Sequence, residues 1–325
     1  MIHPIWQDFP EISSGLEKVR DLMTAEVKIS SPAIREKIHD YIFASGKFIR
    51  SGLCLMFDQV RHGQIQEEKL YAAAGIEMFH LATLIHDDVI DHADMRRGIT
   101  TMHTDYDNRL AIYAGDYLLI AAGRLFAKSK VFDRDNHAFE WSAQGILNGE
   151  ILQLMNQGNS DMSLKQYLKQ IRGKTALLFA LATYTGYYDS QDSTRQSKRA
   201  FYIGEQIGMV FQLSDDLIDY QSKQAQSGKP QFQDVKNGIY TAPLLFAMDK
   251  NAHLKDMIQS QESFTDSNLE RIQQIIKQTQ ALEDSYSLIE TYQQKIRRRL
   301  YRLPGDKASQ EEILLLLDQL DRRQA

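Results

Sequence analysis

The sequence predicts an all-α protein in which residues 1–325 form a single-domain bundle of long helices. Three observations lead to this fold class. Apolar residues recur with a period of about 3.6 in nearly every segment, which is the repeat of an α-helix. No segment shows the convincing alternation of apolar and polar residues that is typical of a strand. Proline and glycine, which interrupt helices, number only six and 18 among the 325 residues.

The composition restricts the classes of function. A hydrophobic share of 43% suffices for a large core, and a net charge of -5 argues against general nucleic-acid binding. Cys54 is the single cysteine, so an internal disulfide is excluded and a cytoplasmic location is expected. Residues 1–15 lack the features of a secretory signal. No run approaches the roughly 18 apolar residues of a transmembrane helix, so none is expected.

The individual helices follow from the same periodicity. Apolar residues from Leu70 to Ile85 recur at helical spacing and lead directly into Asp87. Two stretches rich in turn-forming residues, 190–197 and 221–238, are predicted to be loops. The further helices are predicted at 103–130, 135–158, 174–187, 195–222, 237–250, 282–302 and 308–322.

Two aspartate motifs interrupt this apolar pattern. In "TLIHDDVIDHADMRRG" (Thr83–Gly98), Asp87 and Asp91 lie one helical turn apart on one face, and Asp88 flanks them. The same spacing recurs in "FQLSDDLIDY", at Asp215, Asp216 and Asp219.

Carboxylates at this spacing destabilise a helix unless something compensates their charge. For one isolated motif, water on an exposed surface would be sufficient compensation. Here both motifs are embedded in apolar residues, and buried carboxylates need cations. Oxygen ligands without a His/Cys cluster suit Mg²⁺, which keeps several waters and bridges carboxylates to substrate phosphates. Two such helices facing each other would hold a Mg²⁺–diphosphate cluster between them.

Basic residues near the motifs supply the groups that bind phosphate. Arginine pairs with phosphate oxygens through two parallel hydrogen bonds, and lysine acts as a point charge. Any one base alone is more often a solvated surface residue, but joint occurrence with both aspartate motifs favours phosphate binding. "GKT" lacks the preceding glycine pattern of a P-loop and follows no strand, so an NTPase is rejected. The candidates are Arg96 and Arg97, Gly46, Lys47 and Arg50 in "GKFIR", and Lys174 and Thr175 in "RGKT".

Taken in order, these motifs resemble those of the trans-prenyl diphosphate synthases. The resemblance rests on "GKFIR", "LIHDDVIDHADMRRG", "RGKTALLF", "GEQIGMVFQLSDDLIDY" and "GKPQFQDVKNGIYTAPLL", and covers residues from about 40 to 250. "DNRLAIYAGDYLL" (107–119) more narrowly resembles the catalytic large subunit of bacterial heterodimeric hexaprenyl and heptaprenyl diphosphate synthases.

The resemblance implies an isoprenoid synthase fold, which is an all-α bundle around a deep apolar cavity. It also implies the condensation of isopentenyl diphosphate with an allylic diphosphate such as farnesyl diphosphate. Pyrophosphate is released, and the carbocation formed on the way needs a cavity without water. The product would be a hexaprenyl or heptaprenyl diphosphate for quinone side chains, passed on to a membrane.

The resemblance also assigns roles to residues. About three Mg²⁺ ions would stabilise the leaving diphosphate. Their ligands would be Asp87, Asp91 and Asp215, supported by Asp88, Asp216 and Asp219. Isopentenyl diphosphate would be held at Gly46, Lys47, Arg50, His80 and Arg97. The allylic diphosphate would be held by Arg96, Lys174, Thr175, Gln212 and Lys229.

For two residues on the helix before Asp87, a structural role is the alternative to a functional one. His80 lies two turns before Asp87 and shares its face, but a lone histidine on a helix is more often a satisfied core residue. Ala82 is small, and five residues before Asp87 it would leave a product tunnel open, so that long products form. The alternative is that Ala82 only permits close helix packing.

The resemblance of residues 107–119 to the large subunits of heterodimeric synthases implies a small non-catalytic partner subunit. A physical consideration supports it: a helix of about 20 residues spans about 30 Å, comparable to a long isoprenoid chain, so the tunnel would approach a surface that a partner covers. The alternatives are a homodimeric polyprenyl synthase of other chain length, a terpene cyclase and a regulatory subunit. A cyclase usually carries an Asn/Ser/Glu metal motif where this chain has "DDLID", and regulatory subunits generally lose one aspartate motif.

Overall fold

A computed structural model describes residues 2–44, 46–129, 131, 137–191, 194–221, 232–259 and 265–322. The chain divides into two compact units, and each is described by itself. Unit 1 comprises Met1–Phe139, Leu178–Tyr202 and Leu300–Gln319. Unit 2 comprises Glu140–Leu177, Ile203–Arg299 and Leu320–Ala325.

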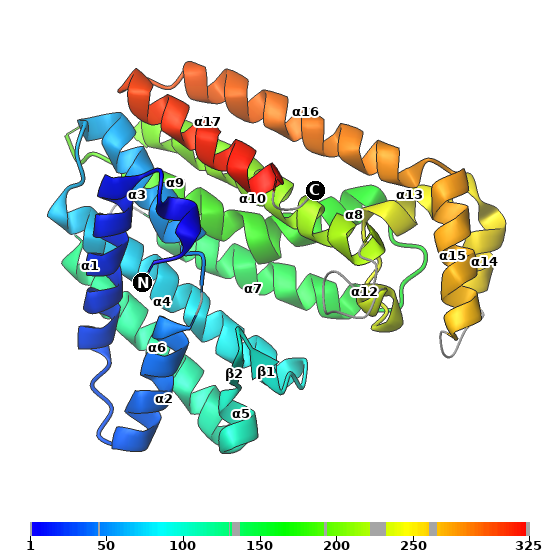
Figure 1. Cartoon of the computed structure of the whole chain (residues 1–325), viewed down its shortest axis with the longest axis horizontal. Helices are drawn as coiled ribbons and strands as arrows, with labels where there is room; N and C mark the ends of the chain where they lie inside the picture. Colours follow the sequence, from blue (N-terminus) through cyan, green and yellow to red (C-terminus); the bar gives the residue numbers. More distant parts are fainter. Residues whose placement is uncertain are drawn as a thin grey trace. The chain divides into compact units, whose positions relative to one another are not determined.

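The predicted all-α class is confirmed: the described residues form helices, and their only strands are two of two residues each (Figure 1). Unit 1 contains a short 3-10 helix (Pro4–Trp6) and the following helices. They are α1 (Pro10–Glu26), α2 (Pro32–Phe43), α3 (Ile49–His62), α4 (Glu67–Ile90), α5 (Met102–Asp105), α6 (Asn108–Lys128), and most of α9 (Leu177–Tyr187) and α17 (Lys307–Arg322).

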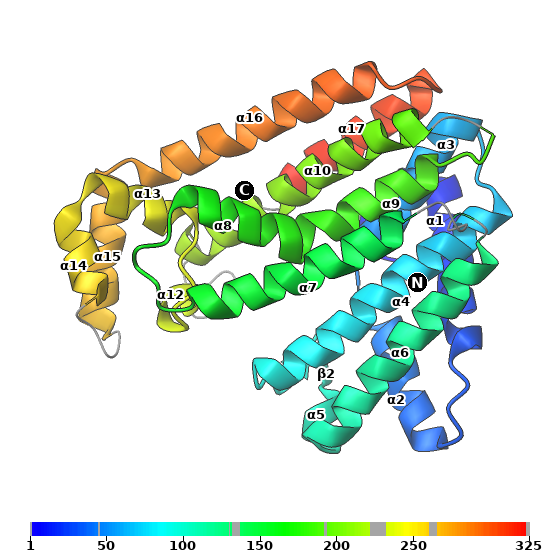
Figure 2. The same cartoon turned by 180° about the vertical axis from the view of Figure 1, so that it is seen from behind.

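Helices α4 and α6 run side by side through unit 1, as both views show (Figures 1 and 2). Small residues allow this close approach. A Cβ atom added at Gly75 of α4 would lie 2.7 Å from the ring of Phe126, and one added at Gly115 of α6 would lie 2.3 Å from Nε2 of His86. The side of α4 that carries Gly75 and His86 therefore faces α6. Among the described helices, α6 alone has the length and apolar composition of a membrane span, but the buried helices of protein cores share these two properties, and 44% of its apolar window is buried.

The helix predicted at 103–130 is divided into α5 and α6. Tyr106 has φ -127° and ψ -93°, which lies outside the helical region. The Asp107 side chain then accepts a hydrogen bond from the Leu110 N–H at 2.7 Å and caps the start of α6. An aspartate at this position offers the backbone an alternative to a continuous helix, which periodicity alone does not register.

A hairpin follows α4 where no strand was predicted. Its strands are β1 (Met95–Arg96) and β2 (Ile99–Thr100), paired antiparallel with Arg96 opposite Ile99. The two turn residues, Arg97 and Gly98, have φ of 50° and 82°. A two-residue loop with both φ values positive matches the twist of the strands it joins. Arg97 is thus held in a conformation that residues other than glycine seldom adopt.

Unit 2 is also helical, and its elements appear in Figure 2. The helix predicted at 237–250 begins later, at Ala242, because Pro243 occupies its first turn. The elements are α7 (Ala138–Asn156), α8 (Leu164–Ile171), the π-helical turn η2 (Arg172–Ala176), most of α10 (Thr194–Gln221), α12 (Gln233–Lys236), α13 (Ala242–Lys250), α14 (Ala252–Gln259), α15 (Asp266–Gln278) and α16 (Ala281–Tyr301).

Candidate functional site

The predicted site residues are distributed over both units. Those in unit 1 are Gly46, Lys47, Arg50, His80, Ala82, Asp87, Asp88, Asp91, Arg96 and Arg97. Those in unit 2 are Lys174, Thr175, Gln212, Asp215, Asp216 and Asp219. The remaining one, Lys229, lies outside the residues that the structure describes.

The first aspartate motif lies at the C-terminal end of α4. Asp87 is half-buried in the last turn, and Asp91 is exposed immediately after Ile90. The Asp91 N–H donates to the Asp87 carbonyl at 2.8 Å, so the two residues are one helical turn apart. A helix C-terminus carries partial negative charge, which makes carboxylates unfavourable there unless a cation is bound. This end of α4 is therefore suited to a cation.

Asp88, the middle residue of the motif, is directed into the protein. It is only 1% exposed, and its Oδ1 accepts a hydrogen bond from Nε of Arg96 at 2.5 Å. Burial raises the pKa of Asp88, while the Arg96 guanidinium opposes this rise. Asp88 thus fixes Arg96 of β1 beside the end of α4.

Gly46 and Arg97 are brought into contact. A Cβ atom at Gly46 would lie 2.5 Å from Nη1 of Arg97, so the guanidinium occupies the space that a side chain at Gly46 would need. Gly46, which was predicted to help hold a diphosphate, thus gives space to a cation, and Lys47 follows it directly. Trp6, which is fully buried, donates from Nε1 to the Lys47 carbonyl at 2.6 Å and holds this segment in place.

Arg50 lies at the start of α3 between residues of two other helices. Its Nη1 is 3.1 Å from Nε2 of His80 on α4. Its Cζ is 4.5 Å from the ring centroid of Phe179 on α9, so the guanidinium lies over the ring. Burial lowers the pKa of His80 well below its usual value, and the positive charges of Arg50, Arg97 and Arg96 lower it further. Cationic side chains therefore surround a neutral imidazole.

Ala82 is completely buried in α4. It lies seven residues after Gly75 and four before His86, so it shares the side of α4 that faces α6. This position is the one expected for a residue that permits close packing.

The second aspartate motif lies on α10 in unit 2. Asp215 is exposed, whereas Asp216 is 5% exposed. The Tyr167 hydroxyl donates to one oxygen of Asp216, and Nε2 of Gln212 donates to the other at 2.8 Å. Thr175 Oγ1 in turn donates to Oε1 of Gln212 at 2.6 Å. Burial raises the pKa of Asp216 to about 7, and both hydrogen bonds oppose this rise.

Asp219 contacts residues 232–234, within the stretch 221–238 that was predicted to be a loop but contains the short helix α12. Its carboxylate accepts from the backbone N–H groups of Gln233 at 3.2 Å and Asp234 at 3.3 Å. The Asp219 carbonyl is 3.4 Å from the Phe232 nitrogen, which also donates to it. Asp219 therefore ties the start of α12 to α10.

Lys174 lies in the π-helical turn η2, and single π-helical turns occur frequently at functional sites. Two glycines allow this turn to approach α7 closely. A Cβ atom at Gly149 would lie 2.2 Å from the Lys174 backbone nitrogen and 2.7 Å from Cα of Gly173. Next to this contact, Nζ of Lys174 is 3.0 Å from Oε2 of Glu150.

Sequence reasoning did not identify four residues that hold the predicted ones in place. Phe179 is the last residue of "RGKTALLF", and Tyr167 lies a few residues before that stretch. The apolar periodicity of a buried helix explains the presence of both rings equally well. Glu150 lies in a predicted helix without a motif that would single it out. No motif singles out Trp6 either, because its contact with Lys47 joins distant parts of the chain.

The carboxylates of the first motif are compatible with a divalent cation that also binds water and a substrate phosphate. Among the described residues, no group of three or more His, Cys, Asp or Glu side chains lies close enough to hold a metal ion. Asp87 and Asp91 offer hard oxygen atoms from one face of a helix end. Mg²⁺ is typically bound by one or two carboxylates, several waters and substrate phosphates. The residues therefore fit Mg²⁺ carried with a diphosphate.

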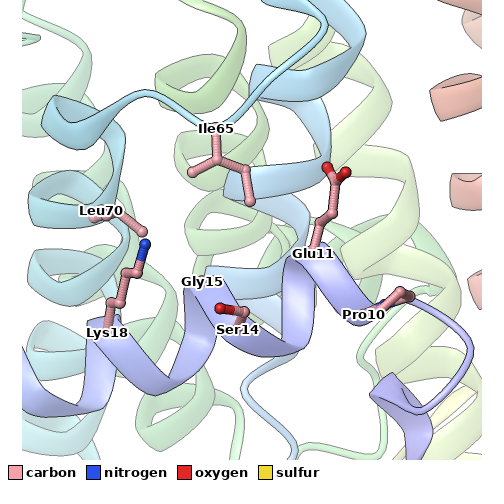
Figure 3. A pocket seen from close by; sticks show the side chains of 7 residues that line it. All are labelled: Pro10, Glu11, Ser14, Gly15, Lys18, Ile65 and Leu70. Atoms are coloured by element: carbon pink, nitrogen blue, oxygen red, sulfur yellow. The ribbon is translucent and has the colours of Figure 1, made fainter.

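A separate pocket of about 400 Å³ lies on unit 1 between α1 and the start of α4 (Figure 3). Glu11 and Lys18 project from α1 toward Ile65 and Leu70, with Gly15 between them. None of its lining residues belongs to the predicted site.

The chain is similar to proteins of known family over most of its length. A model of the polyprenyl synthetase family matches residues 32–278. Heptaprenyl diphosphate synthase component 2 of Bacillus subtilis (strain 168) is 33% identical over 299 residues, which cover 91% of this chain and 85% of that protein. The solved structure of heptaprenyl diphosphate synthase from Staphylococcus aureus matches with a TM-score of 0.88 at 28% identity, covering 97% of this chain and 99% of that one. A polyprenyl synthase from Caulobacter crescentus CB15, complexed with calcium and isoprenyl diphosphate, matches with a TM-score of 0.86 at 26% identity, covering 100% and 99%.

Proposed function

The chain belongs to the polyprenyl synthetase family, and from this membership we propose that it is the catalytic chain of a long-chain polyprenyl diphosphate synthase. It condenses isopentenyl diphosphate with an allylic diphosphate, farnesyl diphosphate in the first instance, and releases pyrophosphate. The observation that carries this proposal is the group of cationic side chains in unit 1, where Arg97 lies against Gly46 and Arg50 against His80. This group matches the charge of a diphosphate.

In this proposal Asp87, Asp91 and Asp215 hold Mg²⁺ together with the allylic diphosphate. When bound, Mg²⁺ supplies positive charge that stabilises the diphosphate as its bond to carbon breaks. The two buried aspartates act differently. Asp88 orients Arg96 toward the substrate, and Asp216 is held by Tyr167 and Gln212 and keeps its part of α10 in register.

The bases divide between the two substrates. Lys47, Arg50 and Arg97 bind the diphosphate of isopentenyl diphosphate. Because Gly46 has no side chain, it leaves space for the Arg97 guanidinium. Lys174 binds the allylic diphosphate together with Arg96, and Thr175 and Gln212 orient the neighbouring aspartate. Lys229 is included on the basis of the sequence motif alone.

The proposal extends to a small non-catalytic partner subunit and to a product of six or seven isoprene units for quinones such as menaquinone. The support for a partner is that the Bacillus subtilis relative is named as component 2 of its synthase. Ala82 is proposed to influence product length.

The test is an elongation assay with radiolabelled isopentenyl diphosphate, farnesyl diphosphate and Mg²⁺, run on the chain alone and with a small subunit. After dephosphorylation, chromatography should reveal one long all-trans prenyl alcohol. A terpene cyclase would release a cyclic hydrocarbon without consuming isopentenyl diphosphate, and a regulatory subunit would give no product. Either of these results, in both arrangements, would contradict the proposed function.

A further inference from the structure

Two side chains from different helices converge on the guanidinium of Arg50. His80, from α4, contacts it edge-on through Nε2 at 3.1 Å. Phe179, from α9, lies against its face with 4.5 Å between Cζ and the ring centroid. Arg50 itself is the second residue of α3, so three helices of unit 1 meet at one cation.

The direction of the histidine contact follows from the chemistry of the two groups. Arginine can only donate hydrogen bonds, so Nε2 of His80 must accept, and the proton of the neutral ring lies on Nδ1. The lowered pKa of His80 agrees with a ring that stays neutral among cations. Nε2 is therefore committed to Arg50 in this structure. The sequence analysis assigned His80 to the substrate, whereas this geometry gives it a second task.

The phenylalanine contact has an equally definite geometry. The face of an aromatic ring carries partial negative charge and attracts a cation placed over it. Phe179 is completely buried, so it cannot turn away from Arg50 without disturbing α9. An edge contact from His80 and a face contact from Phe179 together fix both the direction and the plane of the guanidinium.

We infer that His80 and Phe179 are positioning residues that set the orientation of Arg50 toward the diphosphate of isopentenyl diphosphate. The inference rests on the proposed function, because that function assigns Arg50 to this substrate. Since Nη1 donates to His80 and one face is covered by Phe179, the directions of the remaining N–H groups are fixed before the substrate arrives. A preorganised arginine loses less freedom when it binds a phosphate group.

The first experiment replaces Phe179 and measures KM for each substrate separately. Phe179→Leu keeps an apolar side chain but removes the aromatic face, so KM for isopentenyl diphosphate should rise roughly three- to tenfold, as expected for loss of one cation–π contact. KM for farnesyl diphosphate should not change. Leu181→Val, a core substitution at a buried position on the same helix, is the control and should leave both values unchanged.

A series of fluorinated phenylalanines at position 179 keeps the shape of the ring and avoids the risk of misfolding. Each added fluorine weakens the charge on the ring face, so KM for isopentenyl diphosphate should rise stepwise with fluorination. A flat series in an active enzyme would overturn the role of Phe179. At position 80, His80→Gln retains an acceptor and should preserve KM better than His80→Leu.

A double-mutant cycle shows whether the effect passes through Arg50. In an Arg50→Ala background, Phe179→Leu and His80→Leu should raise KM for isopentenyl diphosphate no further. An equal rise with and without Arg50 would overturn the inference, because the two residues would then act on the substrate or the core directly. A different result would contradict the proposed function itself: a wild-type chain that elongates no primer, either alone or with a small subunit.

Discussion

At the scale of single residues, the middle aspartate of each motif differs from its neighbours in burial and hydrogen bonding. Asp88 and Asp216, the middle members, are buried and hydrogen-bonded to protein groups, whereas Asp91 and Asp215 are exposed. The sequence predicts the motifs, because helical spacing alone places their ends on one face. It does not predict this division, since Arg96 and Tyr167, which contact Asp88 and Asp216, come from other elements of the fold.

The division predicts which aspartates control turnover. Asp87→Ala and Asp215→Ala should each lower kcat by orders of magnitude, because each removes an oxygen that is proposed to hold Mg²⁺ against the leaving diphosphate. Asp94→Ala is the matched control: Asp94 is also an exposed aspartate just beyond α4, and its loss should change kcat little. Steady-state kinetics at saturating Mg²⁺ provide the measurement. Near-normal rates in both variants would contradict the metal assignment.

Gly46 makes a second prediction at this scale. Gly46→Ala adds a Cβ atom 2.5 Å from Nη1 of Arg97, so the guanidinium must move. KM for isopentenyl diphosphate should rise about tenfold, the equivalent of about 1.4 kcal/mol, with KM for farnesyl diphosphate unchanged. Gly123→Ala serves as the control, because no atom lies within 4 Å of the added methyl group. Unchanged KM values for Gly46→Ala would mean that the position of the Arg97 guanidinium does not affect the binding of isopentenyl diphosphate.

Asp58 of α3 predicts a pH dependence of stability. This buried carboxylate accepts from the Gln66 N–H at 2.7 Å and lies 2.8 Å from Nδ1 of His62, yet burial raises its pKa to about 6. The folded state therefore binds the proton more tightly than the unfolded state. The stability that Asp58 contributes is fully present below its unfolded pKa and is lost as the pH rises through about 6.

Urea unfolding of the wild type and of Asp58→Asn at pH 4.5 and pH 7.5 tests this sign. Relative to Asp58→Asn, the wild type should lose about 2 kcal/mol of unfolding free energy between the two conditions, since the amide does not titrate. The difference in unfolding free energy between the wild type and Asp58→Asn should not stay constant with pH or grow in favour of the wild type at pH 7.5. Either result would contradict a raised pKa at Asp58.

At the scale of elements, how much could be predicted depended on whether a feature was local. The helix that leads into Asp87 follows from apolar periodicity. The hairpin after it could not be predicted, because its strands are two residues long and its turn depends on positive φ at Arg97. The break at Tyr106 was missed because the Asp107 cap outweighs a continuous apolar pattern. Contacts such as Trp6 with Lys47 depend on long-range packing that no local pattern encodes.

The interface of α4 and α6 makes a prediction about product length. Ala82 is buried on the side of α4 that faces α6, so Ala82→Phe must displace the helices, at a cost of about 1–3 kcal/mol. If this helix also borders the product tunnel, the products should become shorter. Ala122→Phe is a matched control, because Ala122 is equally buried, lies four residues before Phe126, and shares the side of α6 that faces α4.

The measurement is chromatography of the dephosphorylated products together with thermal unfolding of each variant. Shortened products for Ala82→Phe, but not for an equally destabilised Ala122→Phe, would support a role in chain length. An unchanged product distribution with retained activity would leave Ala82 as a packing residue.

At the scale of the whole chain, the residues proposed for the reaction come from both compact units. Unit 1 contains the carboxylates of α4 and the cations assigned to isopentenyl diphosphate, and unit 2 contains Asp215, Lys174 and the hydrogen bonds around Asp216. The sequence predicted a single-domain bundle in which the aspartate motif is repeated, and not a division of the site residues over two units. Under the proposed function, the reaction requires residues from both units.

The last prediction is that the chain alone is inactive or weakly active and gains activity with a small subunit. Besides the component name of its relative, α6 leaves apolar side chains such as Tyr113 and Ile120 exposed by 67% and 62%, which is unfavourable in water. The chain should be purified alone, its mass in solution measured, and its elongation of farnesyl diphosphate compared with and without the subunit. A homodimeric enzyme would instead show a doubled mass and activity that falls on dilution, with no gain from the subunit. Full synthesis of one long product by the chain alone, independent of its concentration, would rule out the need for a partner, because an isolated chain would then supply every residue that the reaction requires.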